Sequence, residues 1–234
     1  RKVRNSRQAR AMAKGSKYGR KEAEEAWQNA EVAALFRLAS AGVRVPKPYD
    51  FLDGVLLMEL VTDEDGQAAP RLNDVHLEAD QAREYHAFII RQIVLMLCAG
   101  LVHGDLSEFN VLLGPDGPVI IDLPQAVDAA ANNHAFSMLE RDVANMAHYF
   151  GRFAPELKQT RYAKEMWALF QEGKLLPDSV LSGTWKDDEH IADVGGVMRE
   201  IEAAKFEDAR RRAGREEAER GPVKGEEPPP PWAQ

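Results

Sequence analysis

The chain has 234 residues, 44% of them hydrophobic and 29% charged, an ordinary composition for a folded protein with a hydrophobic core. Its most apolar stretch, residues 88–102, is interrupted by Arg91 and Gln92, so no segment resembles a membrane span, and we see no secretory signal. The single cysteine, Cys98, excludes an internal disulfide, and we expect it to pack in the core of a cytoplasmic protein.

The formal net charge of −8 conceals a segregated distribution. Residues 1–21 contain nine Lys or Arg and no Asp or Glu, whereas the rest of the chain carries 21 basic and 38 acidic side chains. Such a basic segment can contact RNA or another polyanion, and it is also typical of a solvated, mobile segment. The chain begins with Arg rather than Met, so we expect it to be a fragment or a processed product.

The first predicted element is a helix over residues 22–39, where apolar side chains recur at helical spacing and Gly42 follows the end. Glu31 lies on the apolar face of this helix, four residues after Trp27 and four before Leu35. A carboxylate in that position needs either a cationic partner or a path to solvent.

A β-hairpin is predicted next. Residues 49–52 and 55–61 flank Asp53-Gly54, a dipeptide that strongly favours a tight turn between two strands. Glu59 interrupts the otherwise apolar second strand.

Beyond the hairpin the pattern predicts mainly helices. These are a helix over residues 79–99 after a polar loop at 62–70, a helix opened by the capping-box sequence Ser137–Glu140 with Asp142 in its first turn, and a helix from Pro155 to Gly173. From residue 206 the sequence is charged and then Pro-rich, which is typical of a disordered tail.

Between the long helix and the later ones, residues 101–122 carry a pattern of polar side chains. Asp105 precedes Asn110 by five residues, and Asp122 follows the apolar run Val119-Ile-Ile121. The runs 111–113 and 119–121, joined by a Pro-Asp-Gly turn, predict a buried hairpin that folds Asp122 back beside Asn110.

Two oxygen ligands at the mouth of a hairpin can hold Mg²⁺, whose other positions are filled by phosphate and water. Asp105 is then free to accept a hydroxyl proton, which matches the kinase pattern of one base and two metal ligands. His103 in the same loop is interpreted as a structural, hydrogen-bonded side chain. Taken alone, the His103-Gly-Asp105 sequence would be typical of a surface loop, and Asp122 at a strand end would be typical of a turn.

The order of elements predicts an α+β chain in which the tail of a small mixed lobe joins a mainly helical large lobe. Together with the kinase pattern and the family resemblance given below, this implies a protein-kinase-like fold with an incomplete small lobe. A ligand cleft is expected between the two lobes.

The chain resembles the RIO-type atypical serine/threonine protein kinases, most strongly their bacterial branch. The resemblance covers residues 22–175 and rests on His103-Gly-Asp-Leu-Ser-Glu-Phe-Asn110, Ile121-Asp-Leu-Pro-Gln-Ala-Val127, Leu139-Glu-Arg-Asp-Val143 and Val55-Leu-Leu-Met-Glu-Leu60. It implies an enzyme that uses ATP and Mg²⁺ and, for the family, a link to maturation of the small ribosomal subunit.

Residue by residue, the resemblance implies that Asp105 is the catalytic aspartate and that Asn110 and Asp122 bind the metal. Met58 to Val61 would form the hinge, where the backbones of Glu59 and Val61 pair with adenine.

Three further residues take their roles from the same resemblance. Ser107 would stand where ordinary kinases keep a phosphate-facing lysine, Glu31 would hold the phosphate-binding lysine, and Asp142 would support the catalytic loop from below.

Two family parts are missing from the sequence, a Gly-rich phosphate loop and a lysine-bearing strand, and both are expected upstream of Arg1. Their loss predicts low activity for this chain, since one preorganised charge-stabilising donor is worth about 10²–10³ in rate. The predicted organisation is therefore a basic mobile segment (1–21), a small-lobe remnant (22–61), a large lobe (62–205) and a disordered tail (206–234).

Three functions remain open. The first is a RIO-type protein kinase or ATPase whose protein substrate is unknown, and the second is a small-molecule phosphotransferase of the aminoglycoside or choline kinase type. The third is a ribosome- or RNA-binding module that uses residues 1–21 and keeps a relic nucleotide site.

Overall fold

The computed structural model describes residues 30–185. They belong to the first of the two units into which the chain divides, residues 1–185 and 186–234. The predicted basic segment at 1–21, the start of the first predicted helix, the end of the predicted large lobe and the predicted tail at 206–234 lie outside the described residues.

The described residues combine short antiparallel hairpins with helices, which confirms the predicted α+β class. In chain order they form a helix at residues 30–40, β1 (Pro48–Leu52), β2 (Val55–Met58), the 3₁₀ helix η1 (Leu72–Asp74), α3 (Ala79–Cys98), β3 (Leu101–Val102), β4 (Val111–Gly114), β5 (Gly117–Ile120), β6 (Val127–Asp128), α4 (Ala135–Phe150), the 3₁₀ helix η2 (Pro155–Gln159) and α5 (Tyr162–Gln171).

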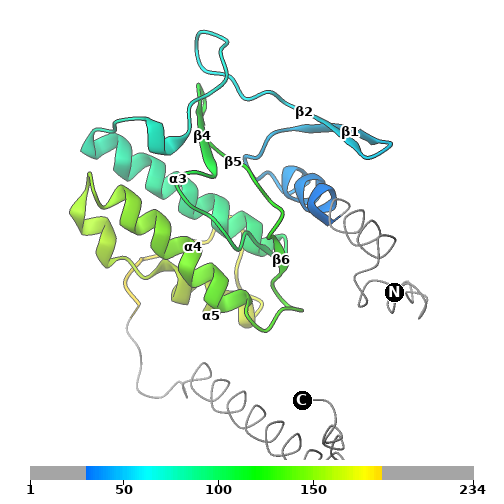
Figure 1. The fold of residues 1–234 in the computed structure, drawn as a ribbon. Helices are drawn as coiled ribbons and strands as arrows, with labels where there is room; N and C mark the ends of the chain where they lie inside the picture. Colours follow the sequence, from blue (N-terminus) through cyan, green and yellow to red (C-terminus); the bar gives the residue numbers. More distant parts are fainter. Residues whose placement is uncertain (1–29, 186–234) are drawn as a thin grey trace, which may run out of the picture. The chain divides into compact units, whose positions relative to one another are not determined.

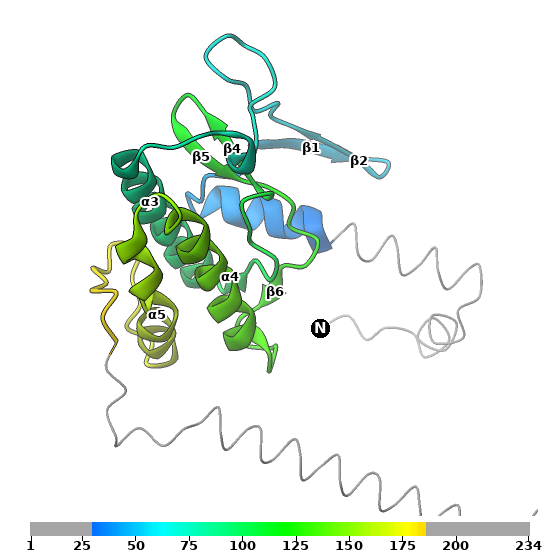
Figure 2. The same ribbon diagram turned by 60° about the vertical axis from the view of Figure 1, so that its left-hand side comes forward.

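The strands pair as three two-stranded antiparallel sheets, β1 with β2, β3 with β6 and β4 with β5. Figures 1 and 2 show α3, α4 and α5 lying together, with the β1–β2 hairpin at the opposite side, near the helix at residues 30–40. The β4–β5 hairpin lies between these two groups in both views.

The predicted turn at Asp53-Gly54 is present, and both residues have positive φ angles, 51° and 81°, as a two-residue hairpin turn requires. The second strand ends at Met58, earlier than the predicted residue 61. The Glu59 N–H still bonds to the carbonyl of Lys47, just before β1.

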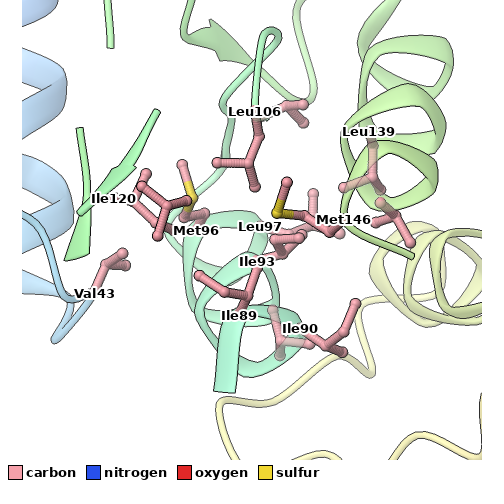
Figure 3. Close-up of a cluster of buried hydrophobic side chains, with 14 of the residues drawn as sticks. Val43, Ile89, Ile90, Ile93, Met96, Leu97, Leu106, Ile120, Leu139 and Met146 are labelled. Atoms are coloured by element: carbon pink, nitrogen blue, oxygen red, sulfur yellow. The ribbon is translucent and has the colours of Figure 1, made fainter. Parts of the chain in front are cut away.

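The core is built around α3. Its buried face meets α4, the helix at residues 30–40 and the loop after β3, and Figure 3 shows Leu106 pointing from that loop into this cluster. Two polar side chains of α3, His86 and Gln92, are buried as well. Cys98 is exposed, so the prediction that it packs in the core is wrong.

Two predicted helix starts are also wrong. The helix α4 begins at Ala135, ahead of the predicted capping box, and the Ser137 hydroxyl donates to the His134 carbonyl within its first turn. This start places Asp142 beyond the first turn. The helix predicted from Pro155 is two elements, η2 and α5, separated at Thr160 and Arg161.

No helix within residues 30–185 combines the length and the apolar character needed to cross a bilayer.

Candidate active site

The candidate site is carried by a loop that β3 and β6 close at its base. Leu101 and Val102 of β3 pair with Asp128 and Val127 of β6, and the β4–β5 hairpin lies between them in sequence. Continuing that hairpin, the Ile121 N–H donates to the Asn110 carbonyl at 3.0 Å. The fold therefore brings Asn110 beside the residue that precedes Asp122, as the sequence predicts.

Asp105 lies exposed on this loop, and the peptide groups around it are bound to Asp142 of α4. One oxygen of Asp142 accepts the Gly104 N–H at 2.8 Å, and the other accepts the Leu106 N–H at 3.0 Å. A single buried carboxylate thus fixes the backbone on both sides of Asp105. This geometry fits the support from below that was predicted for Asp142.

The carbonyl groups next to Asp105 are bound to the same helix. The Arg141 guanidinium donates to the Gly104 carbonyl, and the Asn145 side-chain amide donates to the Leu106 carbonyl at 3.0 Å. Neither residue was predicted to serve the site. Their i, i+4 spacing on one face of a helix is the only signal for them in the sequence, and it does not reveal a backbone partner.

The electrostatics of Asp142 follow from its position, because its residue surface is only 1% exposed. Burial raises the pKa of Asp142, while the two backbone N–H groups and the positive charge of Arg141 act in the opposite direction. The carboxylate is tolerated in the interior because its lone pairs are used by donors.

His103 is buried and uses both ring nitrogens. Its Nε2 lies 3.1 Å from the Ile121 carbonyl, and its Nδ1 accepts the Asp105 N–H at 3.3 Å. A carbonyl can only accept, so this pattern requires the neutral tautomer with the proton on Nε2. The ring joins the Asp105 loop to the end of β5, which fits the structural role predicted for it.

The side chain of Asn110 is held by one hydrogen bond to the Asp105 loop. Its amide nitrogen donates to the Asp105 carbonyl at 2.9 Å, which leaves the side-chain oxygen directed elsewhere. Ser107 lies in the same turn, where its carbonyl accepts the Asn110 N–H at 3.0 Å.

Asp122 lies exposed just after β5 with a φ of 67°. Asp is one of the few residues with a side chain that adopts this left-handed conformation readily.

The amide oxygen of Asn110 and the carboxylate of Asp122 fit a hard cation such as Mg²⁺. Within residues 30–185 no group of three or more His, Cys, Asp or Glu side chains forms a protein-only metal site. A cation here would therefore need oxygen atoms of a bound phosphate and of water to complete its coordination.

Glu31 lies within electrostatic reach of Asp122. Burial raises the pKa of Glu31, and the negative charge of Asp122 raises it further. No Lys or Arg of the described part of the chain forms an ion pair with Glu31. Two carboxylates that raise each other's energy in this way form a location where a cation would be favoured.

The predicted hinge follows β2. Met58 is 47% exposed, whereas Val61 is buried and its carbonyl accepts the Ala69 N–H. Among residues 30–185 no backbone hydrogen bond uses the Glu59 carbonyl or the Val61 N–H, so this acceptor and this donor remain available to a ligand.

The Glu59 side chain has a partner that the sequence did not predict, the guanidinium of Arg44, with N–O distances of 3.0 and 3.1 Å. This hydrogen bond and one from the Lys47 N–H lower the pKa of Glu59.

Gly104 is required by a close backbone contact. Its φ is 85°, and a Cβ atom at this position would lie 2.7 Å from the Gln125 carbonyl oxygen. The segment after Asp122 therefore rests directly on the loop that carries Asp105.

This fold, with Asp105, Asn110 and Asp122 gathered on one loop and the hairpin that follows it, defines a protein-kinase-like domain. The RIO domain family model matches residues 1–163. The chain therefore belongs to the RIO domain family.

The curated relatives include archaeal and eukaryotic proteins. The RIO-type serine/threonine-protein kinase Rio1 of Haloferax volcanii is 44% identical over 132 residues, which cover 54% of this chain and 42% of that protein. The human serine/threonine-protein kinase RIO1 is 35% identical over 136 residues, covering 58% of this chain and 24% of its own length. The chain thus spans less than half of the length of these relatives. Affinity to a bacterial branch remains a prediction.

Proposed function

We propose that this chain provides the catalytic site of a RIO-type protein serine/threonine kinase, which transfers the γ-phosphoryl group of ATP to a protein hydroxyl with the help of Mg²⁺. The observation that carries the proposal is the fixed backbone around Asp105, where Asp142 holds both adjacent N–H groups. Phosphoryl transfer depends on positioning more than on covalent chemistry, so a rigidly held base suits it.

In this proposal each part of the site has one task. Asp105 orients the acceptor hydroxyl and takes its proton. The Glu59 carbonyl and the Val61 N–H bind the adenine edge, and Asn110 and Asp122 hold the metal. When bound, Mg²⁺ neutralises charge on the phosphates.

The proximity of Glu31 to Asp122 supports a positively charged phosphate-binding group at this place. A lysine bound between the two carboxylates would offset the rise in the pKa of Glu31, because that carboxylate would gain an opposite charge. The lysine implied by the resemblance has the right chemistry for this position.

The test begins with nucleotide binding, measured by calorimetric titration of Mg-ATP into the protein and into Asp122→Asn. We expect saturable binding that the substitution weakens at least about tenfold, since a charged metal ligand is lost. The matched control is Asp116→Asn, at the exposed tip of the β4–β5 hairpin, which should bind like the wild type. Absence of Mg-ATP binding by the folded wild type would contradict the proposal.

Phosphoryl transfer is then followed with labelled ATP. Asp105→Asn should lower the rate by about 10²–10⁴-fold, the usual contribution of a positioned general base. Label that is stable to acid indicates a phosphorylated hydroxyl and supports the kinase. Acid-labile label on the protein, lost in Asp105→Asn, indicates instead that Asp105 accepts the phosphate in an ATPase cycle.

We further propose that residues 1–21 contact ribosomal RNA. The support is their nine positive charges without a negative one. Deleting this segment should abolish salt-sensitive RNA binding and leave Mg-ATP binding unchanged.

A further inference from the structure

Arg44 has no role in the proposed reaction, yet it connects three parts of the structure, and we call this set of contacts the Arg44 junction. It lies in the segment between the helix at residues 30–40 and β1, and it makes hydrogen bonds to three different elements. Its N–H donates to the buried side-chain oxygen of Gln92 on α3 at 2.7 Å. Its carbonyl accepts the N–H of Ile120, the last residue of β5, at 2.9 Å.

The side chain of Arg44 reaches the third element, the hinge. Both terminal nitrogens of the guanidinium bind the Glu59 carboxylate, one to each oxygen. The planar fork of arginine matches a carboxylate in this arrangement, and lysine cannot reproduce it. Both side chains are about three-quarters buried, at 29% and 26% exposed, so the pair is shielded from solvent more than an ordinary surface pair.

The Glu59 end of this pair is itself fixed. Its carboxylate also accepts the Lys47 N–H at 2.9 Å, and its own N–H donates to the Lys47 carbonyl at 2.8 Å. Glu59 therefore cannot move without Arg44 and Lys47, and Arg44 is bound to β5 through its carbonyl.

The two ends of the junction lie at the two ends of the proposed nucleotide site. Glu59 carries the carbonyl assigned to adenine, and Ile120 is two residues before Asp122, which is assigned to the metal. We infer that Arg44 is a positioning residue, which fixes the distance between the hinge and the metal ligand so that one nucleotide can reach both.

This inference rests on the proposed function. It predicts a difference between two ligands that would not be expected if the ion pair only stabilised the fold. Adenosine touches the hinge alone, whereas Mg-ATP must span the hinge and Asp122. Loosening the Arg44–Glu59 pair should leave adenosine binding unchanged and weaken Mg-ATP binding. A pair that only stabilises the fold would change both affinities together or neither.

The experiment measures the dissociation constants of adenosine and Mg-ATP for the wild type, Arg44→Gln and Glu59→Gln. We expect each substitution to weaken Mg-ATP about tenfold, a typical coupling between two parts of a protein. Arg44 contributes no group to adenine, so Arg44→Gln should leave adenosine binding unchanged. The double variant should bind Mg-ATP no more weakly than either single variant, because both remove the same contact.

Arg83→Gln is the matched control. Arg83 also forms an ion pair with a glutamate, Glu156, but on the α3 surface and more exposed. This variant should bind both ligands like the wild type. If Arg44→Gln does not fold, Arg44→Lys replaces it, and we expect a smaller Mg-ATP loss because one nitrogen still reaches the carboxylate.

Equal loss of both ligands in Arg44→Gln, or no loss of either, would overturn the inference while the proposed function stands. A folded wild type that binds neither ligand would overturn the proposed function, and the inference with it.

Discussion

The Asp105 loop and the β1–β2 hairpin contribute the two halves of the proposed nucleotide site, and they differ in the support they receive. Around Asp105 each neighbouring N–H and carbonyl is bound by a side chain of α4, and Leu106 is buried in the core. The hairpin instead exposes large apolar side chains, namely Tyr49, Leu52, Val55, Leu57 and, just beyond it, Leu60.

The difference teaches that this chain holds the chemical half of the site through buried side chains of α4, whereas it holds the adenine half through the partly exposed bonds of Glu59 to Arg44 and Lys47. Polar groups buried with all their partners hold a single geometry, because any other would leave one of them unsatisfied. An exposed apolar face imposes no such requirement. The comparison can be tested by changing one region at a time.

The largest effect is expected from Asp142→Ala, which leaves the Gly104 and Leu106 N–H groups buried without an acceptor. We expect a loss of about 2–5 kcal/mol in the free energy of unfolding, measured by chemical denaturation. The control is Asp128→Ala, because Asp128 also accepts two backbone N–H groups but is exposed. It should cost about 1 kcal/mol. Equal losses of stability in the two variants would show that the burial of Asp142 does not add to the stability it provides.

An intermediate effect is expected from pH on the free energy of unfolding, through His86 of α3, which packs against Phe150 of α4. Its ring contacts Phe150 and Tyr162, and its Nε2 has no partner within residues 30–185. Burial lowers the pKa of His86 from 6.5 to about 4. The unfolded chain therefore binds a proton in this range while the folded one does not, so stability is complete above pH 6.5 and falls toward pH 4.

Between pH 7 and pH 5 this linkage amounts to about 2 kcal/mol. Thermal or chemical unfolding at the two pH values should show the loss in the wild type and in His148→Gln, a control at an exposed histidine of α4. The difference in stability between the two pH values should be absent from His86→Gln. An unchanged pH dependence in His86→Gln would assign the effect to other groups.

The smallest effect is expected on the outer face of the hairpin. Leu57→Ala should change the free energy of unfolding by less than about 0.5 kcal/mol, because the side chain is 60% exposed. Its neighbour Leu56 packs against the core cluster, and Leu56→Ala should cost about 1–2 kcal/mol in the same denaturation experiment. A loss for Leu57 as large as that for Leu56 would mean that the outer face is covered in solution.

Local patterns predicted most of the described fold. The Asp53-Gly54 turn, the α3 helix and the β4–β5 hairpin each follow from signals within a few residues, so they could be found without knowing the rest. The same hairpin is why Asn110 could be placed beside the residue before Asp122.

The contacts that the sequence did not predict join residues that are distant in sequence. Asn145 binds a carbonyl 39 residues away, and Arg44 binds Gln92 from 48 residues away, distances that spacing cannot predict. The start of α4 was misplaced because a capping-box sequence can lie inside a first turn when the preceding residues are already helical.

The contact at Gly104 has a consequence for how the sequence can vary over time. A mutation to any other residue would push a Cβ atom against the Gln125 carbonyl, while the exposed Pro115 and Asp116 of the hairpin turn face no such barrier. Selection should therefore hold position 104 constant in lineages that retain this loop and permit drift at the turn. A lineage in which Gly104 has been replaced would mark one where the segment after Asp122 has moved away from the Asp105 loop.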